Sequence, residues 1–417
     1  MAGEWRQLED VIDDILDRRG VTPSKLGGEF TSAGHRVISA KVIKSGRIDL
    51  GADEARFVDA EIYGKWMRTP LRADDVIMTS EAPLGELAYL NRDVDWVLGQ
   101  RLFAIRPRVG ILSGKFLYYA LSMPKVRHSL LARSSGTTVI GIRQAELRKV
   151  EVPVPRIEEQ RAIAGILGAL DDKIELNRGM NRTLEAMARA QFKSWFVEFE
   201  GIPPDNMHKL ESGLIPKGWR LGVLADLAAL NPEAWTNQTR PNEIRYVDLS
   251  NTKWGRIESV TLYAAEEAPS RAQRVLRPND TIVGTVRPGN GSYAFIAEDG
   301  LTGSTGFAVL RPKRDEYAAL VYLAAVAPEN IEALANLADG GAYPAVRAEV
   351  IAATRVIIAD ELTIANFAQC VSPWLEKIAK NERQSRTLAQ LRDALLPRLI
   401  SGELRVKDAE RFLGEVA

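Results

Sequence analysis

One sequence pattern occurs twice in this chain, 204 residues apart. A Lys-Ile pair is followed by Asn three residues after the Ile and by Arg-Thr-Leu five residues after the Asn, first at 173–184 and again at 377–388. A tandem duplication constrains the fold because each copy must build a similar structural unit. With 417 residues the chain also exceeds what one hydrophobic core normally serves. We therefore expect two similar halves, each with its own core, and a target in two parts.

Each half begins with a globular segment and ends with a long helical pattern. Short apolar runs broken by Gly and Pro predict strands and turns, as at 37–48 and its counterpart 246–257. The predicted fold class is α+β, with two tandem, mixed, β-rich domains separated by two long helices that pack as an antiparallel coiled coil with pseudo-twofold symmetry. The predicted boundaries are 1–155 for the first domain, 156–200 for the central spacer helix, 201–215 for a linker, 216–359 for the second domain, 360–400 for the distal spacer helix and 401–417 for a C-terminal tail.

Both helical patterns contain a seam of residues spaced alternately three and four apart, which keeps one face toward a partner helix. The first seam is Ile163, Leu167, Leu170, Ile174, Asn177, Asn181, Leu184 and Ala188, and the second is Phe367, Val371, Trp374, Ile378, Asn381, Ser385 and Leu388. Asn177 and Asn181 match Asn381 and Ser385 in the repeat, and buried polar groups fix the register of a seam. A single helix that faces a core shows the same spacing, but two matched seams favour pairing.

Composition indicates a globular protein with no sign of secretion. Apolar residues make up 46% and charged residues 26%, and no apolar run approaches the roughly 20 residues that span a bilayer. No signal peptide pattern opens the chain, and a single cysteine, Cys370, excludes an internal disulfide framework. These features predict a cytoplasmic protein without a membrane partner. Acidic and basic residues are equal at 55 each, although 125–149 contains six basic residues and one acidic residue.

Short motifs in the centre and at the end of each helical pattern are typical of one protein family. They are Val152-Pro153-Val154-Pro155, Glu159-Gln160, Ile163-Ala164, Leu170-Asp171, Lys173-Ile174, Asn177, Asn181, Leu184-Glu185, Phe192, Trp195-Phe196-Val197, Ile215-Pro216-Lys217-Gly218-Trp219, Leu395-Leu396-Pro397 and Leu399-Ile400-Ser401-Gly402-Glu403. Together with the duplication, they make the chain resemble the specificity (S) subunits of type I restriction-modification systems over essentially its whole length.

The resemblance implies a non-catalytic, sequence-specific DNA-binding subunit. Each globular segment would be a target-recognition domain that reads one half of a bipartite site in double-stranded DNA. The helices would set the unread spacer and dock two methyltransferase (M) subunits. The resemblance implies no cofactor in this chain, with S-adenosylmethionine in the partner DNA adenine methyltransferase and ATP and Mg in separate restriction/motor (R) subunits of an ATP-dependent endonuclease.

Candidate DNA-binding residues are those whose side chains neutralise phosphates, read base edges or stack on bases. They are Lys41, Lys44, Lys65, Arg68, Arg133, Ser134, Thr137 and Arg143 in the first domain, and Arg271, Arg274, Arg287, Asn290, Tyr343 and Arg347 in the second. For each charged residue the alternative is ordinary solvated surface charge, and for Tyr343 it is simple packing. The second domain also departs from the family pattern, because Ala342-Tyr343-Pro344 replaces a Gly/Thr-rich loop of the kind seen at 134–138.

Aromatic and leucine residues near the helix ends exceed what a two-helix seam needs. The predicted partner-binding residues are Phe192, Trp195, Phe196, Leu395, Leu396 and Leu399. Aromatic side chains are favoured at protein interfaces, so these residues predict docking of a methyltransferase subunit. The alternative is local packing against the globular domains.

The sequence offers little support for catalysis by the chain itself. There are three histidines and one cysteine, without metal-ligand spacing, so no catalytic or metal site is predicted. The glycine-rich stretch 284–291 lacks the Gly-Lys-Ser/Thr ending of a phosphate-binding loop. Two other hypotheses remain: a coiled-coil adaptor whose globular domains bind proteins, and a cryptic nuclease or methyltransferase. The first predicts no salt-dependent DNA affinity in the assembled complex, and the second needs a cluster of acidic ligands or a methyl-donor pocket.

Overall fold

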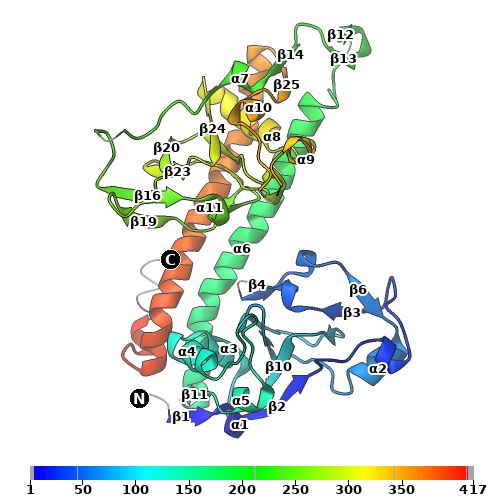
Figure 1. Ribbon diagram of the computed structural model, residues 1–417, viewed down its shortest axis with the longest axis vertical. Coiled ribbons are helices and arrows are strands. Elements are labelled where there is room, and N and C mark those ends of the chain that lie inside the picture. Colours follow the sequence, from blue (N-terminus) through cyan, green and yellow to red (C-terminus); the bar gives the residue numbers. More distant parts are fainter. Residues whose placement is uncertain are drawn as a thin grey trace. The chain divides into compact units, whose positions relative to one another are not determined.

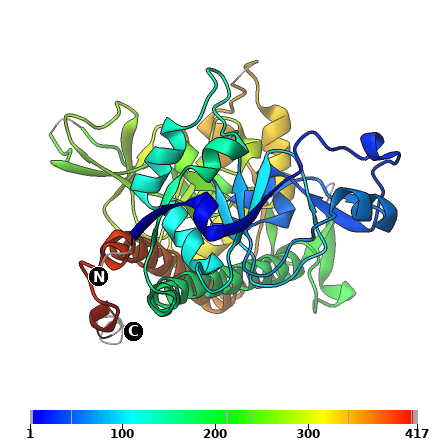
Figure 2. The same ribbon diagram turned by 90° about the horizontal axis from the view of Figure 1, so that it is seen from below.

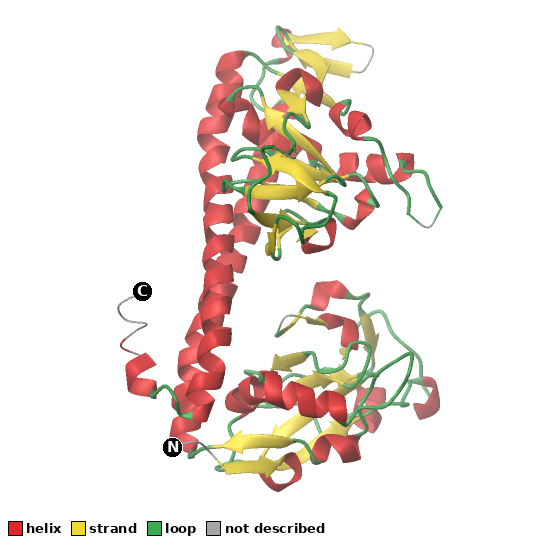
Figure 3. Cartoon of the chain, turned by 60° about the vertical axis from the view of Figure 1, so that its left-hand side comes forward, coloured by secondary structure: helices red, strands yellow, loops and turns green. Residues whose placement is uncertain are grey.

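The computed structural model describes residues 4–44, 46–210, 213–236, 238–341, 343–409 and 411. The chain forms two compact units, Met1–Asp172 with Leu388–Ala417, and Lys173–Thr387. It passes between them at 172–173 and at 387–388, both inside long helices (Figure 1). Figure 3 shows that strands are confined to the globular part of each unit.

The first unit is organised around a four-stranded antiparallel sheet. Its order is β2 (Ile12–Asp17), β10 (Leu102–Pro107), β7 (Val76–Thr79) and β8 (Leu87–Tyr89). The smaller sheets are β6 (Arg56–Val58), β3 (His35–Ile38) and β9 (Val97–Leu98), the hairpin β4 (Ile43–Lys44) with β5 (Arg47–Ile48), and β1 (Glu4–Gln7) with β11 (Glu151–Val154). The helices are α1 (Leu8–Val11), α2 (Ala60–Trp66), α3 (Gly114–Ser122), α4 (Pro124–Ala132) and α5 (Gln144–Arg148), with 3-10 turns at Ser24–Leu26, Ala40–Val42 and Leu50–Ala52. Figure 2 shows α1 as a single turn between β1 and β2.

The second unit repeats this plan. Its central antiparallel sheet has the order β15 (Ala228–Leu230), β24 (Phe307–Pro312), β21 (Thr281–Gly284) and β22 (Tyr293–Phe295). The second sheet is β19 (Thr261–Ala264), β16 (Glu243–Val247), β23 (Leu301–Ser304) and β20 (Ala272–Leu276). The two-stranded pairs are β12 (Met207–Leu210) with β13 (Gly213–Pro216), β14 (Arg220–Val223) with β25 (Arg355–Ile358), and β17 (Thr252–Lys253) with β18 (Arg256–Ile257). The helices are α7 (Leu224–Leu227), α8 (Ala318–Ala325), α9 (Pro328–Leu337) and α10 (Ala348–Ala352), with 3-10 turns at Pro204–Asn206, Leu249–Asn251, Pro288–Asn290 and Asp315–Tyr317.

Each central sheet separates two hydrophobic cores, because successive side chains of a strand point to opposite faces. Along β10, Phe103 and Ile105 join the core that contains α3, whereas Leu102 and Ala104 join the other. Strand β24 divides its side chains between two cores in the same way. In the described residues no single helix is long and apolar enough to cross a membrane, although the bent pair Asp315–Ala325 and Pro328–Leu337 passes that test by length and composition.

Backbone details confirm that the two globular parts are copies of one design. Asp74 and Asn279, 205 residues apart, both have φ of 73°. Ala82 and Arg287, at the same offset, have φ of 47° and 46°. Even residues with different side chains thus keep the same unusual backbone. The predicted α+β fold class is confirmed.

The two long helices are α6 (Ile157–Phe196) and α11 (Glu361–Ser401), which lie side by side in Figures 1 and 2. The acidic pair Glu158 and Glu159 lies in the first turn of α6, where the positive end of the helix dipole stabilises negative charge. Within the second unit the two helices are antiparallel. Asn177 on α6 contacts Ser385 on α11, whereas Asn181, further along α6, contacts the earlier residue Ile378.

A buried polar layer crosses this helix pair. The Asn381 side-chain amide donates to the Asn181 amide oxygen at 2.8 Å, and the Asn177 amide donates to the Ser385 hydroxyl at 3.2 Å. All three asparagines are buried. Because a shifted register would leave these amides unpaired, the layer fixes the alignment of the two helices. The polar layer predicted from the repeat is confirmed.

Glu382 on α11 is a half-buried acid beside this layer. Its Oε1 atom is buried and has no hydrogen-bond partner in the part of the chain that the structure describes. Burial raises the pKa of the Glu382 carboxyl to about 8, and the neighbouring Arg256 and Arg386 offset this only in part. Burial also raises the pKa of Glu185, which faces Glu382 from α6. At pH 7 the folded chain therefore keeps Glu382 mainly protonated.

Raising the pH is expected to weaken the second unit through Glu382. An unfolded Glu ionises near 4.5 and the folded carboxyl near 8. The contribution of the Glu382 carboxyl to the free energy of unfolding is therefore complete below about pH 4.5, and it is lost as the pH rises to about 8. Glu382→Gln should remove this loss and be more stable than the wild-type chain at pH 9 by on the order of 2–4 kcal/mol. Urea denaturation at pH 5, 7 and 9 measures the effect, with Glu403→Gln at an exposed ion pair as control. Parallel profiles for the wild-type chain and E382Q would contradict it.

Candidate nucleic-acid interface

Three segments of the second unit meet at one end of strand β21. They are the β17–β18 turn at Trp254-Gly255, the loop 284–292 and the loop 339–346. The Trp254 amide donates to the Gly291 carbonyl at 2.6 Å, and the Arg287 amide donates to the Pro344 carbonyl at 2.7 Å. A bridge between Val286 and Ala345 adds a further link. The middle loop is thus held by backbone hydrogen bonds on both sides. We call these three segments the second-domain loop assembly.

This assembly displays aromatic and cationic side chains together. The side chains of Tyr343 and Trp254 are 70% and 55% exposed. The Arg287 guanidinium lies 4.7 Å from the centre of the Tyr343 ring, a cation–π contact. Asn290 is exposed on the same middle loop. Exposed aromatic, guanidinium and amide groups on a fixed backbone are the groups that stack on bases and read their edges.

Two residues of the assembly other than glycine have a left-handed backbone conformation. Trp254 has φ of 50° and Arg287 has φ of 46°. This conformation is uncommon for residues with large side chains and costs on the order of 1–3 kcal/mol. Gly291 allows the indole to approach, because a Cβ atom at this position would lie 2.5 Å from Cδ2 of Trp254. Backbone hydrogen bonds therefore hold Trp254 and Arg287 in this strained conformation, and the conformation sets the direction of their side chains.

The arginines on β20 and just before it differ in their availability. The Arg271 guanidinium pairs with Asp248 at 3.1 Å and donates to the Tyr246 hydroxyl at 3.1 Å. The Arg271 carbonyl accepts a hydrogen bond from the Thr305 amide. The neighbouring Gly306 carbonyl accepts one from the amide of Thr285, which lies in the middle loop, so Arg271 borders the loop assembly. Arg274 is partly buried, burial lowers the pKa of its guanidinium, and its Nε atom has no hydrogen-bond partner among the described residues. Arg347 is exposed and occupies the N-cap position of α10, directly after the loop 339–346, without a side-chain capping hydrogen bond.

The first unit contains segments that correspond to these three. The loop 134–142 is closed by mutual hydrogen bonds between Ser135 and Gly141, and the Ile142 amide donates to the Ser80 carbonyl at 3.0 Å. A pocket of about 460 Å³ separates the basic hairpin from the middle loop. It is lined by Ala40, Lys41, Ile43, Lys44, Ala82, Pro83 and Glu86. We call the loops 80–86 and 134–142 with the β4–β5 hairpin the first-domain loop assembly.

The predicted residues of the first domain fall into two groups. Lys44, Ser134 and Thr137 belong to the loop assembly. Lys41 lies just before the hairpin and lines the same pocket, although it also pairs with Asp53 at 3.2 Å. Arg133 and Arg143 flank the loop, and Arg133 pairs with Glu146 at 3.3 Å while Arg143 is exposed. Ser134 donates its hydroxyl proton to the Leu131 carbonyl.

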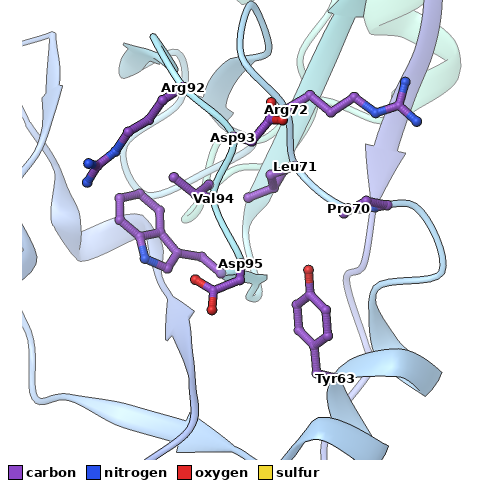
Figure 4. Close-up of a pocket in the computed structure, with 9 residues that line it drawn as sticks. Tyr63, Pro70, Leu71, Arg72, Arg92, Asp93, Val94 and Asp95 are labelled. Carbon is purple, nitrogen blue, oxygen red and sulfur yellow. The ribbon is translucent and has the colours of Figure 1, made fainter.

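Lys65 and Arg68 belong to a different surface, on and just after α2. Lys65 pairs with Glu61 at 2.6 Å. A pocket of about 570 Å³ lies beside this helix, lined by Tyr63, Pro70, Leu71, Arg72, Arg92, Asp93, Val94, Asp95 and Trp96. Figure 4 shows Arg72 and Arg92 extending in opposite directions, with two aspartates between them. This pocket does not concentrate positive charge as a phosphate site would.

The predicted partner-binding residues are largely enclosed by their own unit. Phe196, Leu395, Leu396 and Leu399 are at most 5% exposed and belong to hydrophobic cores. For these four the structure shows the local packing that the sequence left as the alternative. Phe192 stacks on Phe196 at 5.8 Å and Trp195 packs on Phe367 at 5.7 Å, but both remain partly exposed. Docking through Phe192 and Trp195 remains a prediction.

Sequence reasoning missed Trp254 and Arg101. Arg101 has φ of 65°, pairs with Glu81 at 3.1 Å, and its carbonyl accepts from the Ser80 amide beside the first middle loop. The repeat itself contained a signal for Trp254, because Trp254-Gly255 aligns in sequence with Ser45-Gly46 of the first copy. A bulky aromatic residue is unexpected in a two-residue turn. Ser45 and Ala342 lie outside the described residues.

Similar proteins share one description. Residues 4–186 match the family model of the type I restriction modification DNA specificity domain. The type I restriction enzyme MjaIX specificity subunit of Methanocaldococcus jannaschii is 26% identical over 352 residues, which cover 80% of this chain and 78% of that protein. The HindI specificity subunit of Haemophilus influenzae is 23% identical over 403 residues, with 80% and 87% covered. A crystal structure of a type-I restriction-modification system S subunit from M. genitalium shares the fold, with a TM-score of 0.58, 17% identity and 95% and 96% of the two chains covered.

Proposed function

Since the resemblance to specificity subunits of type I restriction-modification systems is confirmed, we propose that this chain selects the sequence at which a partner methyltransferase acts. Each target-recognition domain reads one half of a bipartite site in double-stranded DNA. The helices α6 and α11 set the unread spacer and dock two methyltransferase subunits. The observation that carries this proposal is that each unit places two loops joined by backbone hydrogen bonds beside a β-hairpin that packs on the adjoining strand, β8 in the first unit and β22 in the second.

The chemistry of the loop assemblies supports duplex DNA as the ligand. Lys41 and Lys44 are suited to phosphates, whereas Arg287 and Asn290 are suited to base edges. The chain has no net charge, so phosphate contacts alone supply only a modest attraction. The affinity of the working complex therefore depends on the methyltransferase subunits as well.

Catalysis is assigned to the partners. The methyltransferase subunits supply S-adenosylmethionine and modify adenine, and the restriction subunits supply ATP- and Mg-dependent translocation and cleavage. This chain contributes no cofactor of its own, and the complex acts in the cytoplasm. Among the described residues no group of three or more His, Cys, Asp or Glu side chains is placed to hold a metal ion, so the structure offers no support for a cryptic nuclease.

Modification sequencing tests the proposal directly. Cells that express this chain with its methyltransferase should show a bipartite methyladenine motif that is absent from cells expressing the methyltransferase alone. Replacing residues 216–359 by the second domain of a relative should change one half-site and leave the other and the spacer unchanged. A stable complex that produces no new motif would contradict the proposal and favour the protein-binding adaptor.

A further inference from the structure

We propose that Arg287 reads a guanine at one position of the half-site bound by the second domain, and that Tyr343 positions its guanidinium for this contact. The inference rests on the proposed function, because it assigns one base to one side chain within the second-domain loop assembly. It concerns this domain alone, since Ala82 stands at the equivalent position of the first.

The repeat separates the role of the Arg287 side chain from the role of its backbone. Ala82 and Arg287 have the same left-handed conformation, and each is followed by a proline at the start of the middle loop. An alanine thus adopts the same left-handed conformation at this position of the first copy. The arginine side chain is an addition to the fold, placed at the surface, where it has no core to fill.

Tyr343 restricts the guanidinium before any ligand binds. Its ring lies 4.7 Å from the Arg287 guanidinium carbon, and the ring is itself largely exposed, so core packing does not explain its position. The hydrogen bond from the Arg287 amide to the Pro344 carbonyl fixes the two backbones next to each other. An arginine that is already oriented loses less conformational freedom on binding. Its planar fork matches the O6 and N7 acceptors that guanine presents in the major groove.

Other arginines of this domain are engaged with carboxylates. Arg277 pairs with Glu233 at 2.9 Å, Arg311 pairs with buried Asp280 at 2.9 Å, and Arg271 pairs with Asp248 at 3.1 Å. Breaking these pairs to contact a base would offset part of the gain. The Arg287 guanidinium lies over the Tyr343 ring, and a guanidinium can keep such a stacking contact while its edge donates to a base.

The neighbours of Arg287 suit a groove rather than a lone phosphate. Asn290, on the same middle loop, is exposed and offers an amide for an adjacent base. Trp254 is attached to the other end of this loop through the Gly291 carbonyl and presents an exposed apolar face. A phosphate contact needs only positive charge, whereas amide and aromatic groups around an arginine favour contact with bases.

The test uses the full chain in complex with its methyltransferase. Modification sequencing and binding to duplexes randomised at each position should be measured for Arg287→Lys, which keeps the charge but loses the fork. We expect the wild-type half-site of the second domain to contain a G·C pair whose preference over other pairs falls about 5- to 150-fold in R287K. Tyr343→Leu should reduce the same preference about 2- to 5-fold, and Tyr343→Phe should retain it, because the ring remains.

Matched controls identify how the inference could fail. Arg220→Lys alters another exposed arginine of the second unit, paired with Asp226, and should change no base preference. A uniform loss of affinity at all sequences in Arg287→Ala, with a weaker salt dependence and with every base preference intact, would assign Arg287 to a phosphate and overturn the inference. So would a second-domain half-site without a G·C pair, or an unchanged motif. In each of these results the wild-type bipartite motif persists, whereas its absence would instead reject the proposed function.

Discussion

Replacing Asp280 with alanine is expected to destabilise the second unit by about 3–5 kcal/mol, because it removes one partner of a buried ion pair. The Asp280 side chain is fully buried, and its oxygens accept hydrogen bonds from Arg311 Nε and Nη2, both at 2.9 Å. It also accepts from the Arg277 amide at 2.8 Å. Without the carboxylate, the Arg311 guanidinium retains only Glu233 as a charged partner among the described residues.

Thermal and urea denaturation of Asp280→Ala would measure this loss. Asp299→Ala is the matched control, since Asp299 is 64% exposed and pairs with Arg277 at 3.3 Å, and it should cost less than about 1 kcal/mol. Replacing both Asp280 and Arg311 with leucine should cost less than the single change, because no charge is left buried. Equal effects for Asp280→Ala and Asp299→Ala would contradict the assignment of Asp280 as a structural residue.

The same ion pair occurs in the first copy, where Arg106 Nη2 lies 2.7 Å from Asp75 and the aspartate is again buried. Asp75 accepts from the Arg72 amide at 2.8 Å, as Asp280 does from Arg277. This shared pair joins strands that every copy of the fold needs. It therefore belongs to the scaffold, whereas the residue that stands at position 82 or 287 differs between the copies and lies in the proposed reading surface.

The sequence predicted the parts of the fold that are periodic. The seam spacing and the repeated asparagines predicted two long helices and a polar layer, because such features depend on residues a few positions apart. The matching of Arg106 with Arg311 and of Asp75 with Asp280 was visible as a repeat, but their ion pairs were not. Pairing between strands depends on contacts far apart in the chain, which one sequence does not specify.

The candidate site was predicted less completely for the same reason. Arg287 and Tyr343 were chosen separately by residue type, and only the folded chain shows that they touch. Arg274 was chosen by the same criterion but is partly buried. Phe196 and Leu399 illustrate the opposite difficulty, since apolar residues on a helix predict burial without saying what covers them. In this chain its own cores cover them.

Inserting four residues into each long helix is expected to move the two half-sites apart without changing their sequences. The insertions belong between Asp172 and Lys173 and between Thr387 and Leu388, the two places where the chain passes from one unit to the other. Four helical residues add a rise of about 6 Å and a rotation of about 40°. One base pair adds about 3.4 Å and about 34°, so the rotation suits a spacer longer by one base pair and the rise suits nearly two.

Modification sequencing should therefore show the old half-sites with a spacer longer by one or two base pairs. Inserting two residues in each helix is the informative control, because it adds only about 3 Å but turns the helix by about 200°, and modification should be lost. An insertion in α6 alone should also fail, since it displaces the contacts of Asp171 with Arg392 and of Asn177 with Ser385 relative to each other. If the four-residue insertions left the spacer unchanged, or altered the half-sites, the helices would not set the distance between the two recognition domains.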